Sequence, residues 1–459
     1  MSLKIKALLN RLTGCKPEAR FVLEAIARDG SLGRDEGQCI RSKLLAKQLH
    51  MAEGAAAAAL GELVSAGLVE RIESATTGKG RPRVSYKFAP QSLALLADQE
   101  CALVNSEHLQ RLFSGADIPA EILGSKPKPR KQRAVVTKDG NPAPPGARSR
   151  LSIRNRLLLG ALLANADKFG VVEGLSSQEL RQLTGLDSES LNHRLRRLRG
   201  LGLIRSYVPG VTSSIFRGKK VSSTYFLNLN HPGYGLGESG AILVHCLPQS
   251  KVQEDPCDLL WRDVHGFRGT YPPLSAPETP KTVLRFLASA QQPVFDVLRI
   301  KLYRCASELL SRHWSDLALD GKGSYDWLRD QIGAVFEPPA GFGEGGVEPD
   351  QIWAEILDYF CTLAVDIARA YRARFGAANW IGFDLVQHCI LPVLQSDRDE
   401  VIALLMQPRP QEASKCTVLW ESLRGDLIPE HWGAEAEVPL NYRFKCGLLT
   451  PPARRLLKR

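Results

Sequence analysis

The feature that most constrains the fold is an internal repeat in the first half of the chain, with a shift of 135 positions between its two copies. Matching residues recur along both copies: Leu45 and Leu180, Met51 and Leu186, Leu60 and Leu195, Leu63 and Leu198, and Gly67-Leu68-Val69 and Gly202-Leu203-Ile204. A repeat of a whole domain requires the same order of helices and strands twice. It therefore supports the interpretation of each copy more strongly than either copy does alone.

The second copy shows the order of elements most clearly. Ser177–Thr184 is predicted to be a short helix that stops at Gly185, because glycine readily takes the left-handed conformation that ends a helix. Ser188 is predicted to cap a second helix, which ends at Gly202. In that second helix three leucines recur at i, i+4 and i+7 and so share one face: Leu191, Leu195 and Leu198.

The opposite face of this second helix is polar and mostly basic. It carries Glu189, His193, Arg196 and Arg197, with Asn192, Arg194 and Arg199 beside them. Arginine can bond the edge of guanine with two parallel hydrogen bonds, and asparagine can do the same with adenine. The pattern therefore favours a helix that reads bases. The alternative is a solvated basic helix on an ordinary helical domain.

A hairpin is expected to follow the second helix. Leu203-Ile204 begins one predicted strand and Tyr225-Phe226-Leu227 ends its partner, and the loop between them holds Arg217, Lys219 and Lys220. This order of elements resembles the winged helix-turn-helix domains of MarR- and ArsR-like bacterial regulators, over about residues 16–90 and 150–230. The resemblance implies that the second helix enters the major groove and that the hairpin lies along the DNA backbone.

The first copy differs from the second on its second helix. The positions of Asn192, His193, Arg196 and Arg197 are taken there by residues with almost nothing to read bases with: Ala57, Ala58, Gly61 and Glu62. Its predicted hairpin loop, in contrast, contains Lys79, Arg81 and Arg83 around a K-G-R-P sequence that resembles the minor-groove hook of AT-binding proteins. A flexible basic turn is the alternative.

These patterns predict a mainly α fold with small β-hairpin wings, made of two winged helix-turn-helix domains and a helical C-terminal domain. The expected segments follow in order: winged helix domain 1 at 16–90, a helical extension at 91–124, a basic Pro/Gly-rich linker at 125–150, winged helix domain 2 at 151–230, an irregular connector at 231–280 and a helical domain at 281–459. Within the last, helices are expected over Lys281–Leu319, Gln351–Phe375 and Trp380–Gln407. The linker is long enough for the two modules to occupy separate sites on DNA.

The charge of the chain is divided unequally between its halves. Residues 1–240 contain 36 Lys or Arg against 21 Asp or Glu, whereas residues 241–459 contain 24 against 28. This division is expected of a protein whose basic half binds nucleic-acid phosphates and whose slightly acidic half has a different function. We therefore expect the C-terminal half to form a homo-oligomer or to bind a protein partner.

Several classes of protein are not supported by the sequence. No apolar run reaches the length of a membrane span, and the ten cysteines include no C-x-x-C pair. No phosphate-binding glycine loop or hydrolase motif occurs, so we expect no enzyme activity and no cofactor or metal. A cytoplasmic, nucleoid-associated protein fits these observations.

The sequence thus predicts a sequence-specific protein that binds double-stranded DNA, most simply a bacterial transcription regulator. A replication initiator of a plasmid or mobile element is the first alternative, since such proteins also use two winged helices. A protein-interaction scaffold is the second alternative, and the basic first half argues against it.

Overall fold

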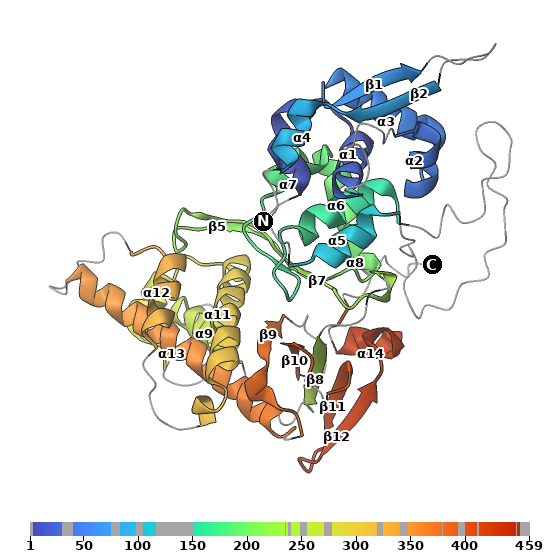
Figure 1. The fold of residues 1–459 in the computed structure, drawn as a ribbon. Coiled ribbons are helices and arrows are strands. Elements are labelled where there is room, and N and C mark those ends of the chain that lie inside the picture. The colour runs from blue at the N-terminus through green and yellow to red at the C-terminus, as the bar shows by residue number, and fades with distance from the viewer. Residues whose placement is uncertain are drawn as a thin grey trace, which may run out of the picture. The chain divides into compact units, whose positions relative to one another are not determined.

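The structure is a computed structural model that describes residues 3–29, 40–74, 83–97, 104–115, 151–234, 236, 240–247, 255–269, 278–318, 325–339, 348–378, 380–392, 400–410, 413–446 and 448–449. The chain forms two compact units (Figure 1). Unit 1 contains residues up to Arg205 together with 225–237, and unit 2 contains 206–224 together with 238–450. The expected linker at 125–150 lies outside the described residues.

Unit 1 holds both copies of the repeat. Repeat 1 consists of α1 (Pro17–Asp29), α2 (Ser42–Leu49), α3 (Glu53–Ser65), β1 (Val69–Ser74) and β2 (Arg83–Phe88), and it follows a short 3-10 helix, η1 (Lys4–Leu12). The two strands are antiparallel, with Val69 opposite Phe88, and Ile40 forms a single bridge to Tyr86 on the outer side of β2.

Repeat 2 has the same order of elements. It consists of α6 (Ile153–Leu163), β3 (Val171–Val172), α7 (Ser177–Thr184), α8 (Ser188–Gly200), β4 (Ile204–Val208) and β7 (Thr224–Leu227), with the strands in the order β3-β7-β4. A shift of 135 positions places α2 on α7 and α3 on α8 at both ends, and a shift of 136 places the start of α1 on the start of α6. The repeat seen in the sequence is therefore a repeat of structure.

The two repeats pack together through α1 and α6. Most residues of both helices are buried, including Ala19–Ala27 of α1 and Asn155–Leu163 of α6. A helix that is apolar around much of its circumference, as α6 is, needs neighbours on several sides. The repeats thus share one core, which differs from the expectation of two modules joined only by a linker. The helical extension is present as α4 (Pro90–Ala97) and α5 (Ser106–Phe113).

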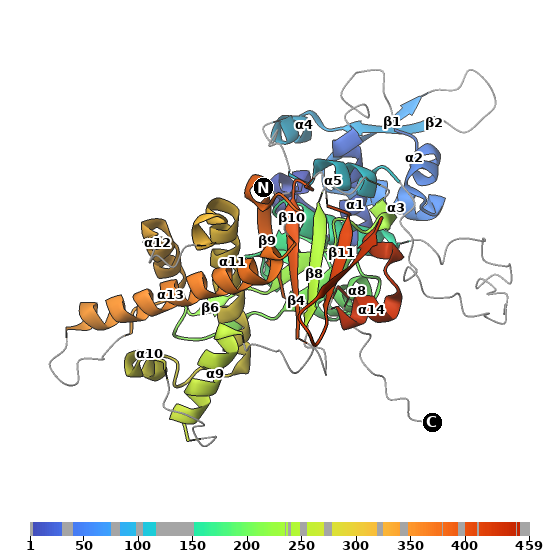
Figure 2. The same ribbon diagram turned by 90° about the horizontal axis from the view of Figure 1, so that it is seen from below.

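Unit 2 is built on a five-stranded sheet that the sequence did not predict (Figure 2). The strands are β8 (Ala241–Leu247), β9 (Gln387–Leu391), β10 (Glu400–Gln407), β11 (Cys416–Glu421) and β12 (Leu427–Trp432), in the order β12-β11-β8-β10-β9. Only β8 and β11 pair in parallel.

The sheet corrects two expectations. The expected irregular connector at 231–280 contains the central strand β8 and the helix α9 (Pro256–Phe267), and the expected helix Trp380–Gln407 contains β9 and β10. All seven residues of β8 are buried. A strand buried on both faces is apolar almost throughout, so the sequence periodicity does not distinguish it from a buried helix.

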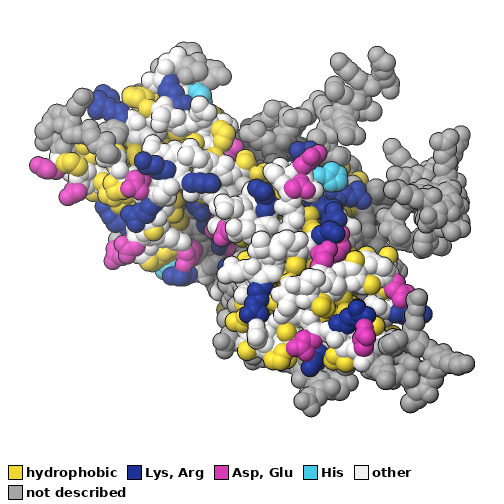
Figure 3. Space-filling view, turned by 90° about the horizontal axis from the view of Figure 1, so that it is seen from above, with side chains coloured by type: hydrophobic (Ala, Val, Ile, Leu, Met, Phe, Trp, Pro, Cys, Tyr) yellow, Lys and Arg dark blue, Asp and Glu magenta, His cyan; other side chains and the backbone are white. Residues whose placement is uncertain are grey.

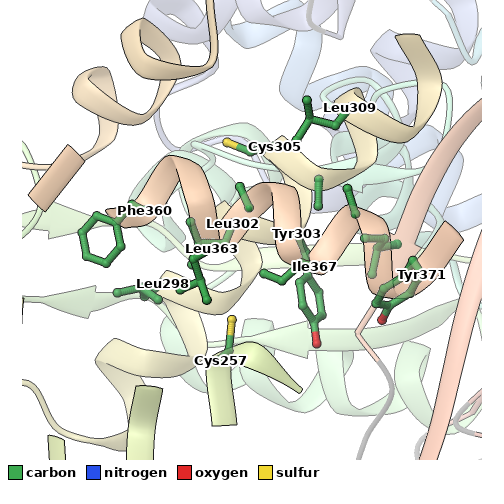
Figure 4. Close-up of a cluster of buried hydrophobic side chains, with 14 of the residues drawn as sticks. Cys257, Leu298, Leu302, Tyr303, Cys305, Leu309, Phe360, Leu363, Ile367 and Tyr371 are labelled. Atoms are coloured by element: carbon green, nitrogen blue, oxygen red, sulfur yellow. The ribbon is translucent and has the colours of Figure 1, made fainter. Parts of the chain in front are cut away.

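Helices cover the sheet and form the larger part of the core of unit 2. They are α10 (Lys281–Phe286), α11 (Gln292–His313), α12 (Asp326–Val335), α13 (Pro349–Gly376) and α14 (Leu440–Lys445), with short 3-10 turns η4 (Asp316–Ala318), η5 (Phe383–Leu385) and η6 (Glu435–Glu437). Leucines of α11 interleave with Phe360, Leu363 and Ile367 of α13 (Figure 4). The expected helix Gln351–Phe375 is confirmed, and the expected helix Lys281–Leu319 is present as α10, α11 and η4.

Described residues therefore form many helices with several small sheets, so the fold is mixed and not α with hairpins alone. Among these residues, no helix has the combination of length and apolar character that crossing a bilayer requires.

Candidate nucleic-acid interface

The outer side of α8 carries several of the residues that the sequence assigned to DNA. Four of them are exposed and together define the α8 face: Asn192, His193, Arg196 and Arg197. On the opposite side Leu191 and Leu198 are buried, and Leu195 is half-buried. The helix thus presents two arginine forks, one amide and one imidazole on a single solvent-facing surface.

Caps on both helices fix the turn that leads into α8. The Ser176 hydroxyl accepts a hydrogen bond from the Glu179 amide, and Glu179 accepts one from the Ser176 amide, which begins α7 and lowers the pKa of Glu179. Gly185 ends α7 with a φ of 68°, as predicted. Asp187, not Ser188, caps α8 and accepts a 2.7 Å hydrogen bond from the Ser190 amide. That hydrogen bond also lowers the pKa of Asp187.

Arg194 does not belong to the α8 face. Its Nη1 donates a 2.9 Å hydrogen bond to Asn155 Oδ1 and a longer one, 3.4 Å, to Ser152 Oγ, both at the start of α6. Burial lowers the pKa of this guanidinium. Arg194 therefore holds α8 against the first helix of its own repeat. Its partners are Asn155 and Ser152, which also caps α6 as its sequence position predicts. Arg199 is half-buried, so it is not among the four exposed residues that define the α8 face.

The corresponding helix of repeat 1 offers little polar chemistry. Ala57, Ala58 and Gly61 of α3 are exposed, so this side of the helix has no hydrogen-bonding side chain at those positions. Glu62 is half-buried and accepts a 2.9 Å hydrogen bond from the Lys16 amide, while its other oxygen lies 3.2 Å from Lys16 Nζ. The two repeats thus differ most at the positions where base reading was expected.

The distal part of the second hairpin, residues 206–224, belongs to unit 2 and is anchored there. Beyond β4 the chain forms β5 (Val211–Thr212) and β6 (Lys220–Val221), and we call residues 209–223 the hairpin tip. Phe216 is fully buried, and its ring stacks on Phe336 with centroids 5.7 Å apart. Main-chain bonds add to this contact, because the Arg217 amide donates to Val335 O and the Glu337 amide donates to Ile215 O.

The anchored hairpin tip keeps its cations at the surface. Arg217, Lys219 and Lys220 are all exposed. Lys219 has a φ of 60°, a left-handed conformation that a residue with a side chain adopts at some cost, and Gly218 before it has a φ of 72°. The turn is closed by hydrogen bonds from the Lys219 amide to Phe216 O and from the Ser213 amide to Lys219 O. The tip is thus a fixed cationic turn.

The cations of the first hairpin are less fully described. Lys79 and Arg81 lie outside the described residues, and Arg83 is the first residue of β2, opposite Ser74. Their assignment to DNA remains a prediction.

Groups that could hold a metal were sought among the described side chains. No cluster of three or more His, Cys, Asp or Glu residues is present in that part of the chain. His245 Nε2 lies 3.2 Å from Glu421 Oε2, and Cys246 Sγ lies 3.8 Å from Cys446 Sγ, so these two neighbouring residues both face protein groups.

Charge is dispersed over the surface that Figure 3 shows. Lys and Arg side chains alternate there with Asp, Glu and uncharged groups. On that face the net positive charge is not gathered into one patch among the described residues. The local arrangement of the α8 face is therefore more informative than the net charge of the chain.

Comparisons of the chain with protein-family models, with curated proteins and with solved structures give no match.

Proposed function

We propose that the chain is a sequence-specific protein that binds double-stranded DNA, that both repeats are winged helix-turn-helix modules, and that α8 reads bases in the major groove. The observation that carries this proposal is the α8 face, an exposed set of two arginines, an asparagine and a histidine on a helix fixed by caps and a glycine turn. These side-chain types match the hydrogen-bonding edges of guanine and adenine.

The alternative of an ordinary solvated helix explains the exposed charge but not its placement. α8 directly follows the short helix α7 and a tight turn, and strands follow it. α3 of repeat 1 likewise follows the short helix α2 and precedes the strands β1 and β2. In domains of this kind the second helix of the pair lies in the groove. The polar residues gather on the side of α8 that would meet DNA, and Arg194 turns to the other side, where it supports α6.

The repeats then have unequal tasks. α8 supplies the sequence code, whereas α3 can offer only methyl and backbone contacts through Ala57, Ala58 and Gly61. We assign affinity to the first hairpin with Lys79, Arg81 and Arg83, where arginine favours a narrow AT-rich minor groove. The exposed cations of the hairpin tip are assigned to phosphates.

Arg196→Ala tests the assignment of the α8 face. If Arg196 bonds a base, the variant should lose about 1–3 kcal/mol of binding free energy on the preferred site and much less on random DNA. Arg424→Ala is the matched control, because it removes the same charge from an exposed turn of unit 2. Equal losses on both DNAs would reduce Arg196 to a phosphate contact, and no loss on either would remove α8 from the interface.

The biological role follows from where the protein binds. Genome-wide mapping of bound DNA should place it at promoters if it is a transcription regulator acting on the nucleoid. Binding confined to direct repeats near an origin would instead support a replication initiator. Binding of a protein partner that does not weaken with salt, with no bound DNA, would support the scaffold.

A further inference from the structure

Two buried arginines make reciprocal contacts between the repeats. Arg20 of α1 and Arg156 of α6 are 136 positions apart and so occupy the same place in their repeats. Arg20 donates to Leu12 O of η1 at 2.8 Å and to Gln182 O near the end of α7. Arg156 donates to Leu112 O of α5 at 2.8 Å and to Leu49 O at the end of α2 at 3.3 Å. Each arginine thus ties the helix that precedes its own repeat to α7 or α2 of the other repeat, the helix before α8 or α3.

An ion pair joins two equivalent positions. Glu18 of α1 and Arg154 of α6 are also 136 positions apart, and Arg154 Nε lies 2.6 Å from Glu18 Oε1. In a two-fold arrangement, contacts are reciprocal, and a residue on the axis meets its own equivalent. In a head-to-tail arrangement, contacts join different surfaces and equivalent positions do not meet. These contacts are the ones expected of two repeats related by an internal two-fold axis near Glu18 and Arg154.

Two hollows in unit 1 follow the same relation. One, of about 250 Å³, is lined by the end of α1, by α2 and by α5, and the other, of about 170 Å³, by the end of α6, by α7 and by η1. Asp29 lines the first and Asn165 the second, again 136 positions apart. The symmetry thus extends to the surface of unit 1.

The two-fold relation gives α3 and α8 equivalent positions about the axis. Lys16, two residues before Glu18, bonds Glu62 of α3, and Ser152, two residues before Arg154, bonds Arg194 of α8. Because a two-fold rotation preserves height along its axis, the two helices lie at the same height along it. The contacts run from α3 to α1 to α6 to α8. Three steps of 8–10 Å between the axes of packed helices add up to about 30 Å, which is close to one turn of B-DNA.

We infer that unit 1 is an internal dimer and that one chain engages one duplex across this axis. The target is then a compact site with two half-sites in inverted orientation, about one helical turn apart or less, of which the α8 half carries the sequence information. This inference rests on the proposed function. In place of two modules that a linker allows to occupy separate DNA sites, it predicts two modules held at a fixed distance and orientation.

A symmetrised variant tests the orientation of the half-sites. Ala57→Asn, Ala58→His and Gly61→Arg give α3 three side chains of the α8 face at equivalent positions. A Cβ built at Gly61 meets no atom within 4 Å, and all three positions are exposed. Glu62 is kept because it bonds Lys16. The DNA probes are duplexes with two copies of the half-site that the wild-type chain selects from random DNA, placed in inverted or direct orientation at a series of spacings.

The variant is expected to bind one inverted spacing at least tenfold more tightly than any direct repeat. Inserting five base pairs should abolish this gain, because half a turn moves one half-site to the opposite face of the duplex. Wild type, which lacks the side chains on α3, serves as the control and should gain little from the second half-site. Equal binding of direct and inverted repeats, or indifference to spacing, would overturn the internal dimer.

Sedimentation of the wild-type chain with its selected duplex gives a second measurement that does not depend on the folding of the variant. One chain per duplex, together with a footprint that covers both half-sites, is expected. Two chains across the same footprint would overturn the inference. A wild-type chain that selects no DNA sequence would refute the proposed function instead, so the two failures are distinct.

Discussion

Phe216→Ala should destabilise unit 2 although the residue lies in a loop that reads as basic and exposed. Phe216 is fully buried, stacks on Phe336, and through it continues to Phe360, whose ring centroid is 4.7 Å from that of Phe336. Truncation of a buried phenylalanine costs about 3–5 kcal/mol, from lost transfer free energy and the cavity left behind. For a unit of this size the melting temperature should fall by roughly 6–20 °C.

Tryptophan fluorescence can follow this change in unit 2 alone. All seven tryptophans of the chain belong to unit 2: Trp261, Trp314, Trp327, Trp353, Trp380, Trp420 and Trp432. Ser214→Ala is the matched control, because Ser214 is exposed in the same hairpin tip and its loss should change the free energy of unfolding by less than about 0.5 kcal/mol. A Phe216→Ala protein that melts like the control would show that the hairpin tip is not anchored.

Two further predictions concern residues whose roles the structure defines. Arg194→Ala should lower the stability of unit 1 by about 1 kcal/mol through the lost bond to Asn155, whereas Arg196→Ala should not, as circular dichroism during unfolding would show; equal stabilities would contradict the positioning role. Burial lowers the pKa of His388 to about 4, so the unfolded chain binds its proton first as the pH falls below about 6.5. Unit 2 should lose about 3 kcal/mol between pH 6.5 and pH 4 through this group, and His388→Phe, measured by the same fluorescence, should remove that part of the pH dependence; an unchanged pH dependence would contradict it.

The repeat made the helices of unit 1 predictable, because two copies of one pattern fix the same boundaries independently. The side of α8 on which Arg194 lies could also be predicted from the sequence. Position 194 follows Leu191 by three and precedes Leu198 by four, so it shares their buried side. The hydrogen bonds of Arg20 and Arg156 to carbonyl groups of the other repeat could not be predicted, because nothing in the local sequence identifies a tertiary partner.

The sheet of unit 2 shows a different limit. Strands β8 and β10 are rich in leucine and alanine, which favour helices, and they become strands because neighbours bury them on both sides. Ile215 and Phe216 are a sequence signal for the anchoring of the hairpin tip. An apolar pair in a polar hairpin loop, directly before a run of cations, needs a buried partner, and in this chain the partner lies more than a hundred residues later.

The anchoring of the hairpin tip also decides what a DNA-binding fragment can do. The charge distribution suggests a cut after residue 240, but such a fragment keeps Ile215 and Phe216 and loses Val335, Phe336 and Glu337. The fragment should still bind DNA through α8, more weakly than the whole chain, because the tip cations are no longer held in one turn. Phe216→Ala should then leave the fragment's affinity and melting unchanged, while the same substitution in the whole chain lowers both. An equal effect in the two proteins would mean that Phe216 packs within unit 1 and that α12 does not hold the hairpin tip in place.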